Sequence, residues 1–209
     1  MAAPIEDTLA HYGNVMDEIR KRLHFVDWAL GLPVTDDALE YIAVSDLCLL
    51  QFRKIFEAIA IGCLLVHGDL PKTNKLKKDI YRADKLLKAL ANLDADFYPV
   101  PCDLERSEGK IRSRTAIGGN WLTRERLQEL YTALDANLHV GTLTRRKLGA
   151  EPIKRDALVG IAQLTRRLLH THRINVAHAG IRIIAELDGP DGVPFVSVQR
   201  RKPNPNAGP

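Results

Sequence analysis

The chain has 209 residues, of which 45% are hydrophobic and 27% are charged, as in an ordinary globular protein. A chain of this size and composition can bury a core of its own, so it needs no disulfide or metal in order to fold. The charge is uneven: 12 Lys and Arg against 15 Asp and Glu give residues 1–100 a net charge of −3, whereas 18 against 11 give residues 101–209 a net charge of +7. The second half is therefore expected either to face an anionic partner or to carry solvated basic helix faces.

The cysteines and the apolar runs indicate the compartment. Cys48, Cys63 and Cys102 are odd in number and widely spaced, which is typical of neither a disulfide framework nor a zinc site. The first residues lack the basic and apolar regions of a signal peptide, and the apolar run 59–66 is too short to span a bilayer. We therefore expect a cytoplasmic protein with no cofactor, no bound metal and no membrane partner.

Five segments have the spacing of amphipathic helices, with apolar residues at every third or fourth position. The second of them is the most hydrophobic part of the chain, which predicts a central helix, and Ser45-Asp46 could divide it in two. Thr123 is suited to cap the fourth. The predicted helices are residues 14–30, 36–67, 75–93, 123–138 and 155–170.

The segment 94–120 breaks this pattern, because proline and glycine interrupt a stretch that also carries several arginines. A loop this long in a compact domain is usually functional or mobile, or contains short strands. Residues 97–98 and 111–117 could supply such strands, and a domain boundary inside the segment is the alternative.

The end of the chain changes from helical to strand periodicity. Charged Arg182 and Glu186 alternate with apolar neighbours, and turn residues 188–192 separate them from a second apolar run. This pattern predicts an antiparallel β-hairpin over 181–200, followed by a disordered tail, 204–209. The expected fold is a single mainly α (α+β) domain, residues 1–203, in which a bundle of four to five helices ends with this hairpin.

The densest cluster of candidate functional residues is Arg166-Arg167-Leu-Leu-His170-Thr-His172-Arg173, at the end of the last predicted helix. An arginine can hold a phosphate through its planar fork, and a histidine can move a proton near neutral pH. Metal-independent cleavage of RNA needs these two functions, so Arg167 and His172 are the catalytic candidates, and Arg166, His170 and Arg173 are binding candidates.

The segment from Arg167 to His172 resembles the Arg-x4–6-His motif of HEPN domains. The resemblance implies a helical bundle, a dimer whose paired motifs form the active cleft, and a ribonuclease, toxin or defence protein. It also implies that Arg167 holds the phosphate and that His172 is the acid/base.

Other interpretations of this cluster stay open. Arg166, His170 and Arg173 lie where cations stabilise a helix C-terminus, so they can be a helix cap. The three histidines His170, His172 and His178 could suggest a metal, but no carboxylate or cysteine accompanies them, and we expect none.

A second cluster lies on the central helix, where Arg53 and Glu57 are spaced as an i,i+4 pair. Glu57 stands in an apolar helix and needs a partner if it is buried. The two residues are expected either to form a structural ion pair or to orient a catalytic residue of the last helix.

Two other classes of function compete with the ribonuclease. The first is a non-catalytic protein that binds RNA or another polyanion, or a regulatory partner, through its arginine-rich second half. Residues 124–148 have a spacing faintly like that of a helix-turn-helix. The second is a protein that associates with a partner or with itself through the free edge of the hairpin. The basic stretches are 106–114, 124–126, 145–147 and 200–202.

Overall fold

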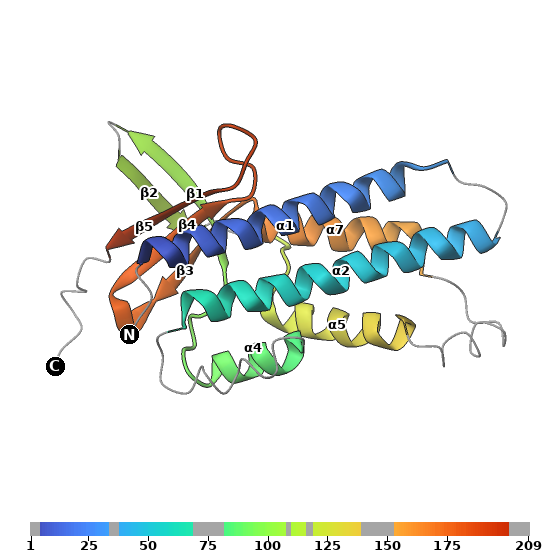
Figure 1. The fold of residues 1–209 in the computed structure, drawn as a ribbon, viewed down its shortest axis with the longest axis horizontal. Coiled ribbons are helices and arrows are strands. Elements are labelled where there is room, and N and C mark those ends of the chain that lie inside the picture. Colours follow the sequence, from blue (N-terminus) through green and yellow to red (C-terminus); the bar gives the residue numbers. More distant parts are fainter. Residues whose placement is uncertain are drawn as a thin grey trace.

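The computed structural model describes residues 5–33, 38–68, 82–107, 110–115, 119–138 and 153–200. These residues form a mixed α+β fold that is mainly helical, as the sequence predicted (Figure 1). The described helices are α1 (Ile5–Gly31), α2 (Ala38–Val66), α4 (Ala83–Ala91), α5 (Arg124–Leu138) and α7 (Arg155–Leu169). The strands are β1 (Val100–Ser107), β2 (Lys110–Thr115), β3 (Thr171–Val176), β4 (Ile181–Glu186) and β5 (Phe195–Arg200), with a short 3-10 turn at Ala177–Ala179.

Helix α1 buries the stripe of residues that its periodicity predicted, including Ile19, Leu23 and Val26. It begins at Ile5, however, and not at residue 14. Leu9 and Tyr12 pack against the core and extend the same apolar stripe toward the N-terminus, which explains the extra turns.

Helix α2 is continuous, so the predicted break at Ser45-Asp46 is wrong. It lies at the centre of the helical layer and contacts α1, α4, α5 and α7. Its aromatic residues Phe52 and Phe56 are fully buried. Helices α1 and α2 approach closely at Gly62, where an added Cβ would lie 2.9 Å from the Tyr12 ring. A glycine at this position therefore leaves room for the Tyr12 ring.

The remaining helices follow the predicted pattern. The Thr123 hydroxyl accepts a hydrogen bond from the Arg126 backbone N–H at 3.2 Å, which confirms the predicted cap of α5. Helix α7 ends within one residue of the prediction. Helix α4 occupies the later part of the predicted helix 75–93, and residues 75–81 lie outside the described part of the chain.

The strands form one antiparallel sheet of five described strands in the order β2-β1-β3-β4-β5. The predicted strands near the C-terminus pair as expected, in β4 and β5, but they belong to this larger sheet. Strand β2 corresponds to the strand expected at 111–117, whereas the predicted strand at 97–98 is wrong because β1 begins at Val100. Strand β3 was not predicted.

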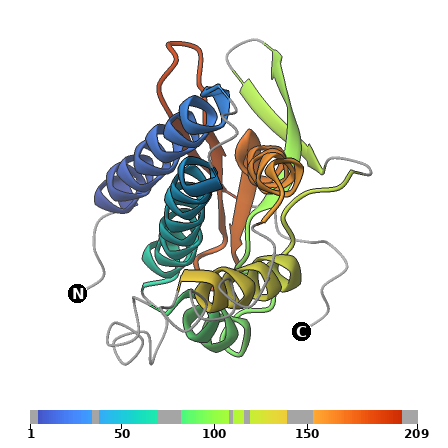
Figure 2. The ribbon, with the colours of Figure 1, turned by 90° about the vertical axis from the view of Figure 1, so that its right-hand side faces the viewer.

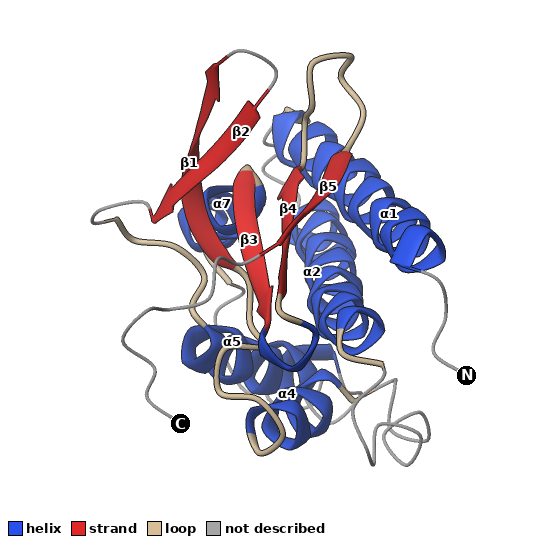
Figure 3. Ribbon diagram, turned by 90° about the vertical axis from the view of Figure 1, so that its left-hand side faces the viewer, coloured by secondary structure: helices blue, strands red, loops and turns tan. Residues whose placement is uncertain are grey.

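The helices lie behind one face of the sheet, as Figure 3 shows, and the other face carries no described helix. Alternate residues of β3 separate these faces: His172, Ile174 and Val176 are buried toward the helices, and Thr171, Arg173 and Asn175 lie on the opposite side. We call the side of Arg173 the outer face.

No described helix is both long and apolar enough to cross a membrane. The predicted tail, residues 204–209, and the basic run 145–147 lie outside the described residues.

Candidate anion-binding face of the sheet

Arg167 is exposed near the C-terminal end of α7. Its Nη1 donates a hydrogen bond to the backbone oxygen of Asn120 at 3.3 Å. This contact holds the guanidinium group beside the segment that precedes α5. The Arg167 side chain remains accessible to solvent.

His172 lies in β3 and is only 1% exposed. Its Nε2 is 2.7 Å from the Tyr12 hydroxyl, and its Nδ1 is 3.1 Å from the Leu169 backbone oxygen. Because that oxygen only accepts, Nδ1 carries the hydrogen and Nε2 accepts the hydrogen bond from Tyr12. Burial lowers the pKa of His172 from 6.5 to about 4 and raises that of Tyr12 well above its usual value. His172 is therefore neutral at pH 7, with both nitrogens already bonded.

The structure does not bring Arg167 and His172 into a common cleft within one chain. The sequence placed both near the end of one helix, but the helix ends at Leu169 and β3 begins at Thr171. The change of backbone direction turns His172 inward, between the sheet and α1, while Arg167 stays on the outside of α7.

The flanking residues of the motif have separate positions. Arg166 forms an ion pair with Asp27 and donates to the Leu23 backbone oxygen at 3.3 Å, so it joins α7 to α1. His170 is exposed at the C-cap of α7, and its backbone N–H bonds the Arg166 oxygen at 2.7 Å. Arg166 therefore makes a structural contact, whereas His170 terminates the helix.

Arg53 and Glu57 form the predicted i,i+4 ion pair, with Arg53 Nε 3.2 Å from Glu57 Oε1. Their other contacts go to α5: Tyr131 donates its hydroxyl to Glu57 at 3.2 Å, and Asp135 forms an ion pair with Arg53. The expectation that they orient a residue of the last helix finds no support, because in the described structure their partners lie on α2 and α5.

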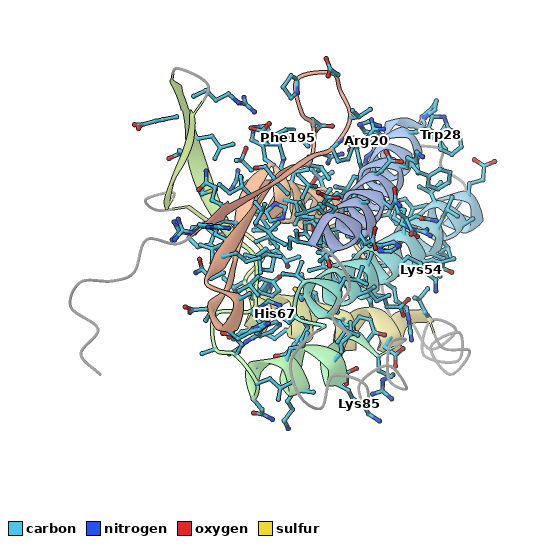
Figure 4. The ribbon with its side chains drawn as sticks, turned by 60° about the vertical axis from the view of Figure 1, so that its left-hand side comes forward. Arg20, Trp28, Lys54, His67, Lys85 and Phe195 are labelled. Atoms are coloured by element: carbon cyan, nitrogen blue, oxygen red, sulfur yellow. The ribbon has the colours of Figure 1, made fainter. Side chains whose placement is uncertain are left out.

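His67 is a positioning residue whose role the sequence did not indicate. It is fully buried after the end of α2, and Figure 4 shows it between that helix end and the sheet. Its Nδ1 lies 2.9 Å from the Cys63 backbone oxygen, and its Nε2 lies 3.2 Å from the Asn175 backbone oxygen. His67 thereby attaches β3 to α2 from the inner side of the sheet.

The outer face consists of side chains arranged in rows by the strand register. One row crosses β3, β4 and β5 through Arg173, Ile184 and Ser197. A second row, on one side of the first, consists of Asn175, Arg182 and Gln199. A third row, on the other side, consists of Thr171, Glu186 and Phe195. Arg173 and Arg182 are thus diagonal neighbours on adjacent strands, and such neighbours lie about 7–8 Å apart, within reach of long side chains.

Arg106 joins this face from β1. Its Nη2 donates to Glu186 Oε2 at 2.6 Å, and its guanidinium carbon lies 6.0 Å from the centre of the Phe195 ring. Figure 4 shows Phe195 on the strand side of the molecule. Among the described residues of these rows, Glu186 is the only acid and Arg173 and Arg182 are the two arginines. With Arg106 of β1, three arginines stand against this one carboxylate.

Arg182 also contacts a residue of β3 two positions from Arg173. Arg182 Nε donates to Asn175 Oδ1 at 3.0 Å, in the row that His67 supports from behind. Cys102 lies beside Arg173 and is 4% exposed, and burial raises the pKa of its thiol to about 11 although the arginine charge opposes the rise. Cys102 is therefore a buried and unreactive thiol, and the guanidinium groups carry the chemistry of this face.

Sequence reasoning had named Arg173, but as part of a different site. Arg182 stood out only as a polar position in an alternating strand, and Arg106 lay in a segment with no assigned structure. The strand alternation Thr171, Arg173, Asn175 was the available signal, although only the register of β3 with β4 shows that Arg173 and Arg182 are adjacent.

The other basic stretches and the metal expectation can be placed only in part. Arg124 and Arg126 form ion pairs with the neighbouring Glu125 and Glu129 on α5. The second half of the possible helix-turn-helix lies outside the described residues. The described residues contain no group of three His, Cys, Asp or Glu that could hold a metal ion.

Comparison with known proteins gives no relative: no protein-family model, no curated protein and no solved structure matches this chain.

Proposed function

We propose that this protein is a non-catalytic binding protein whose outer sheet face binds single-stranded RNA. The observation that carries the proposal is the adjacency of Arg173 and Arg182 on the sheet face that no described helix covers, with Arg106 on the same side. Arginine forks bind phosphate oxygens in pairs, and two such forks on a rigid sheet can contact neighbouring phosphates of one strand.

The composition of the face also suits a single strand. Phe195 offers an aromatic ring beside Arg106, and Asn175 and Gln199 supply polar groups for sugar and base edges. The described residues of the three rows include two arginines and one acid, and Arg106 of β1 adds a third arginine, so the local charge attracts a polyanion. The net charge of +7 in residues 101–209 acts in the same direction.

The ribonuclease with a HEPN-like fold stays a prediction, and the geometry favours it less. Its acid/base, His172, has both nitrogens bonded inside the core, whereas proton transfer to RNA requires a nitrogen within reach of the ribose. A dimer that joins two copies of the motif would still need His172 to leave this position. Under the binding proposal, RNA remains intact.

The proposal is tested by the fluorescence anisotropy of a short labelled single-stranded RNA. For the Arg173→Gln, Arg182→Gln double variant we expect the affinity to fall roughly 100-fold, because two charge-assisted contacts of about 1.4 kcal/mol or more are lost. The salt dependence of log K should become shallower by about one for each phosphate contact that is removed.

The matched control is the Arg124→Gln, Arg126→Gln double variant, which removes the same charge from α5. It should keep most of the affinity and nearly the full salt dependence. Equal losses in the two double variants, or no binding by the unaltered protein, would refute the proposal. Gel analysis of the same RNA distinguishes the alternative: cleavage that disappears in Arg167→Ala would favour the ribonuclease.

The proposal also includes a reducing, cytoplasmic setting, which three free and buried cysteines support.

A further inference from the structure

An apolar pocket lies at the end of the helical layer, where the C-terminal end of α1 meets the N-terminal ends of α2 and α7. Figure 2 looks onto this side of the molecule, with the sheet behind the helices. The pocket has a volume of about 420 Å³, within the range of sites that bind small molecules. Its described lining residues come from the helices and the residues next to them, and none comes from a strand. The pocket is separate from the outer sheet face and has no part in the proposed RNA binding.

The wall of the pocket is mainly hydrocarbon. Leu30 and Leu158 line it from the buried side, Leu32 lines it from the residues just after α1, and Ala43 and Val44 line it from α2. The Tyr41 hydroxyl does not add a free polar group, because it donates to the Ile153 backbone oxygen at 2.7 Å. Such a wall suits a hydrocarbon chain, because removing apolar surface from water is favourable.

Two polar side chains of the lining have no hydrogen-bond partner among the described residues. Ser45 is 1% exposed, and its Oγ makes no hydrogen bond in the described structure. Arg155, in the first turn of α7, makes no described ion pair. Its charge acts on the Cys48 thiol, one turn after Ser45, so its guanidinium lies beside this part of α2.

Charge selects the class of ligand. Arg155 stands at the N-terminal end of a 15-residue helix, where the peptide dipoles also favour an anion. Among the described residues of the lining the one acid is the exposed Glu40, which would repel a second negative charge on the ligand. One guanidinium therefore suits a single carboxylate better than a doubly charged phosphate group.

We propose that this pocket binds a monocarboxylate with a hydrocarbon chain, such as a medium-chain fatty acid. Arg155 pairs with the carboxylate, Ser45 donates its hydroxyl to the same end of the ligand, and the apolar wall covers the chain.

The test is calorimetric titration of the full-length protein with decanoate, and with decanol, which has the same chain but no charge. We expect decanoate to bind and Arg155→Gln to weaken it about tenfold or more, with little effect on decanol. Lys154→Gln is the matched control. It removes a positive charge at the residue next to Arg155, and the Lys154 side chain is not among the described residues that line the pocket. It should change decanoate binding little.

A second variant tests the apolar wall. Ala43 is exposed at the pocket, so Ala43→Trp adds bulk there without enlarging a buried core residue. We expect it to abolish the binding of both ligands while the thermal unfolding midpoint stays unchanged. Absence of decanoate binding to the unaltered protein, equal weakening by Arg155→Gln and Lys154→Gln, or undiminished binding by Ala43→Trp would each overturn the proposal.

Discussion

Replacing His172 by alanine is expected to destabilise the protein by about 3–5 kcal/mol, the range of large-to-small substitutions in a packed core. His172 is 1% exposed, so the substitution leaves a cavity between β3 and α1. It also removes the acceptor of the Tyr12 hydroxyl and the donor to the Leu169 oxygen, and buried groups without a partner cost about 1–3 kcal/mol each.

The measurement is urea unfolding followed by circular dichroism, with His170→Ala as the control. His170 lies two residues earlier, is exposed, and should change the free energy of unfolding by no more than about 0.5 kcal/mol. A catalytic His172 on an accessible surface would give the opposite pattern, in which His172→Ala keeps its stability and loses only activity. Similar small effects for both variants would show that His172 is not a core residue.

The second large effect is a loss of stability on acidification. The pKa of His172 is about 4 in the folded protein and 6.5 in a solvated histidine, so between these values the unfolded chain binds a proton that the folded chain does not. The stabilising contribution of His172 is fully present above pH 6.5 and is lost as the pH falls to about 4. Because each pH unit is worth about 1.4 kcal/mol, the loss amounts to roughly 3 kcal/mol.

Other groups also titrate in this range, so the His172→Gln variant serves as the reference. This variant lacks the titrating ring but keeps a polar side chain opposite Tyr12. The difference in unfolding free energy between the unaltered protein and the variant should shrink by roughly 3 kcal/mol as the pH falls from 7 to about 4. A difference that stays constant across this range would contradict the assignment of the low pKa to His172.

The helices were predictable because their signal is local. The repeat of apolar residues in α1 and α7 appears within one segment, and burial follows it closely. The continuity of α2 was not predictable from Ser45 and Asp46, since surrounding helices on several sides stabilise a helix through positions of moderate propensity.

The sheet was harder to predict because its pairing is not local. Strand β1 contains Pro101 and three charged residues, and this composition masks its strand character. Strand β3 follows α7 almost directly, and its charged residues were explained equally well as a helix terminus. The alternation of β3 is visible in retrospect, with Ile174 inward and Arg173 outward.

The candidate site depended on this missing register. Arginine content and charge asymmetry directed attention to the second half of the chain, and Arg173 lay within the suspected cluster. The reversal of the chain after Leu169 then separated Arg167 from His172 and brought Arg173 beside Arg182. A motif defined by spacing alone carries no information about such a reversal.

The outer sheet face is proposed to bind RNA. An NMR titration of the labelled protein with single-stranded RNA tests this proposal most directly. The binding proposal predicts that the largest amide shift changes cluster on β3, β4 and β5, around Arg173, Asn175 and Arg182, and that the RNA is recovered intact. Shift changes that cluster instead on the exposed side of α7 around Arg167 and His170, or RNA that is cleaved during the titration, would contradict it.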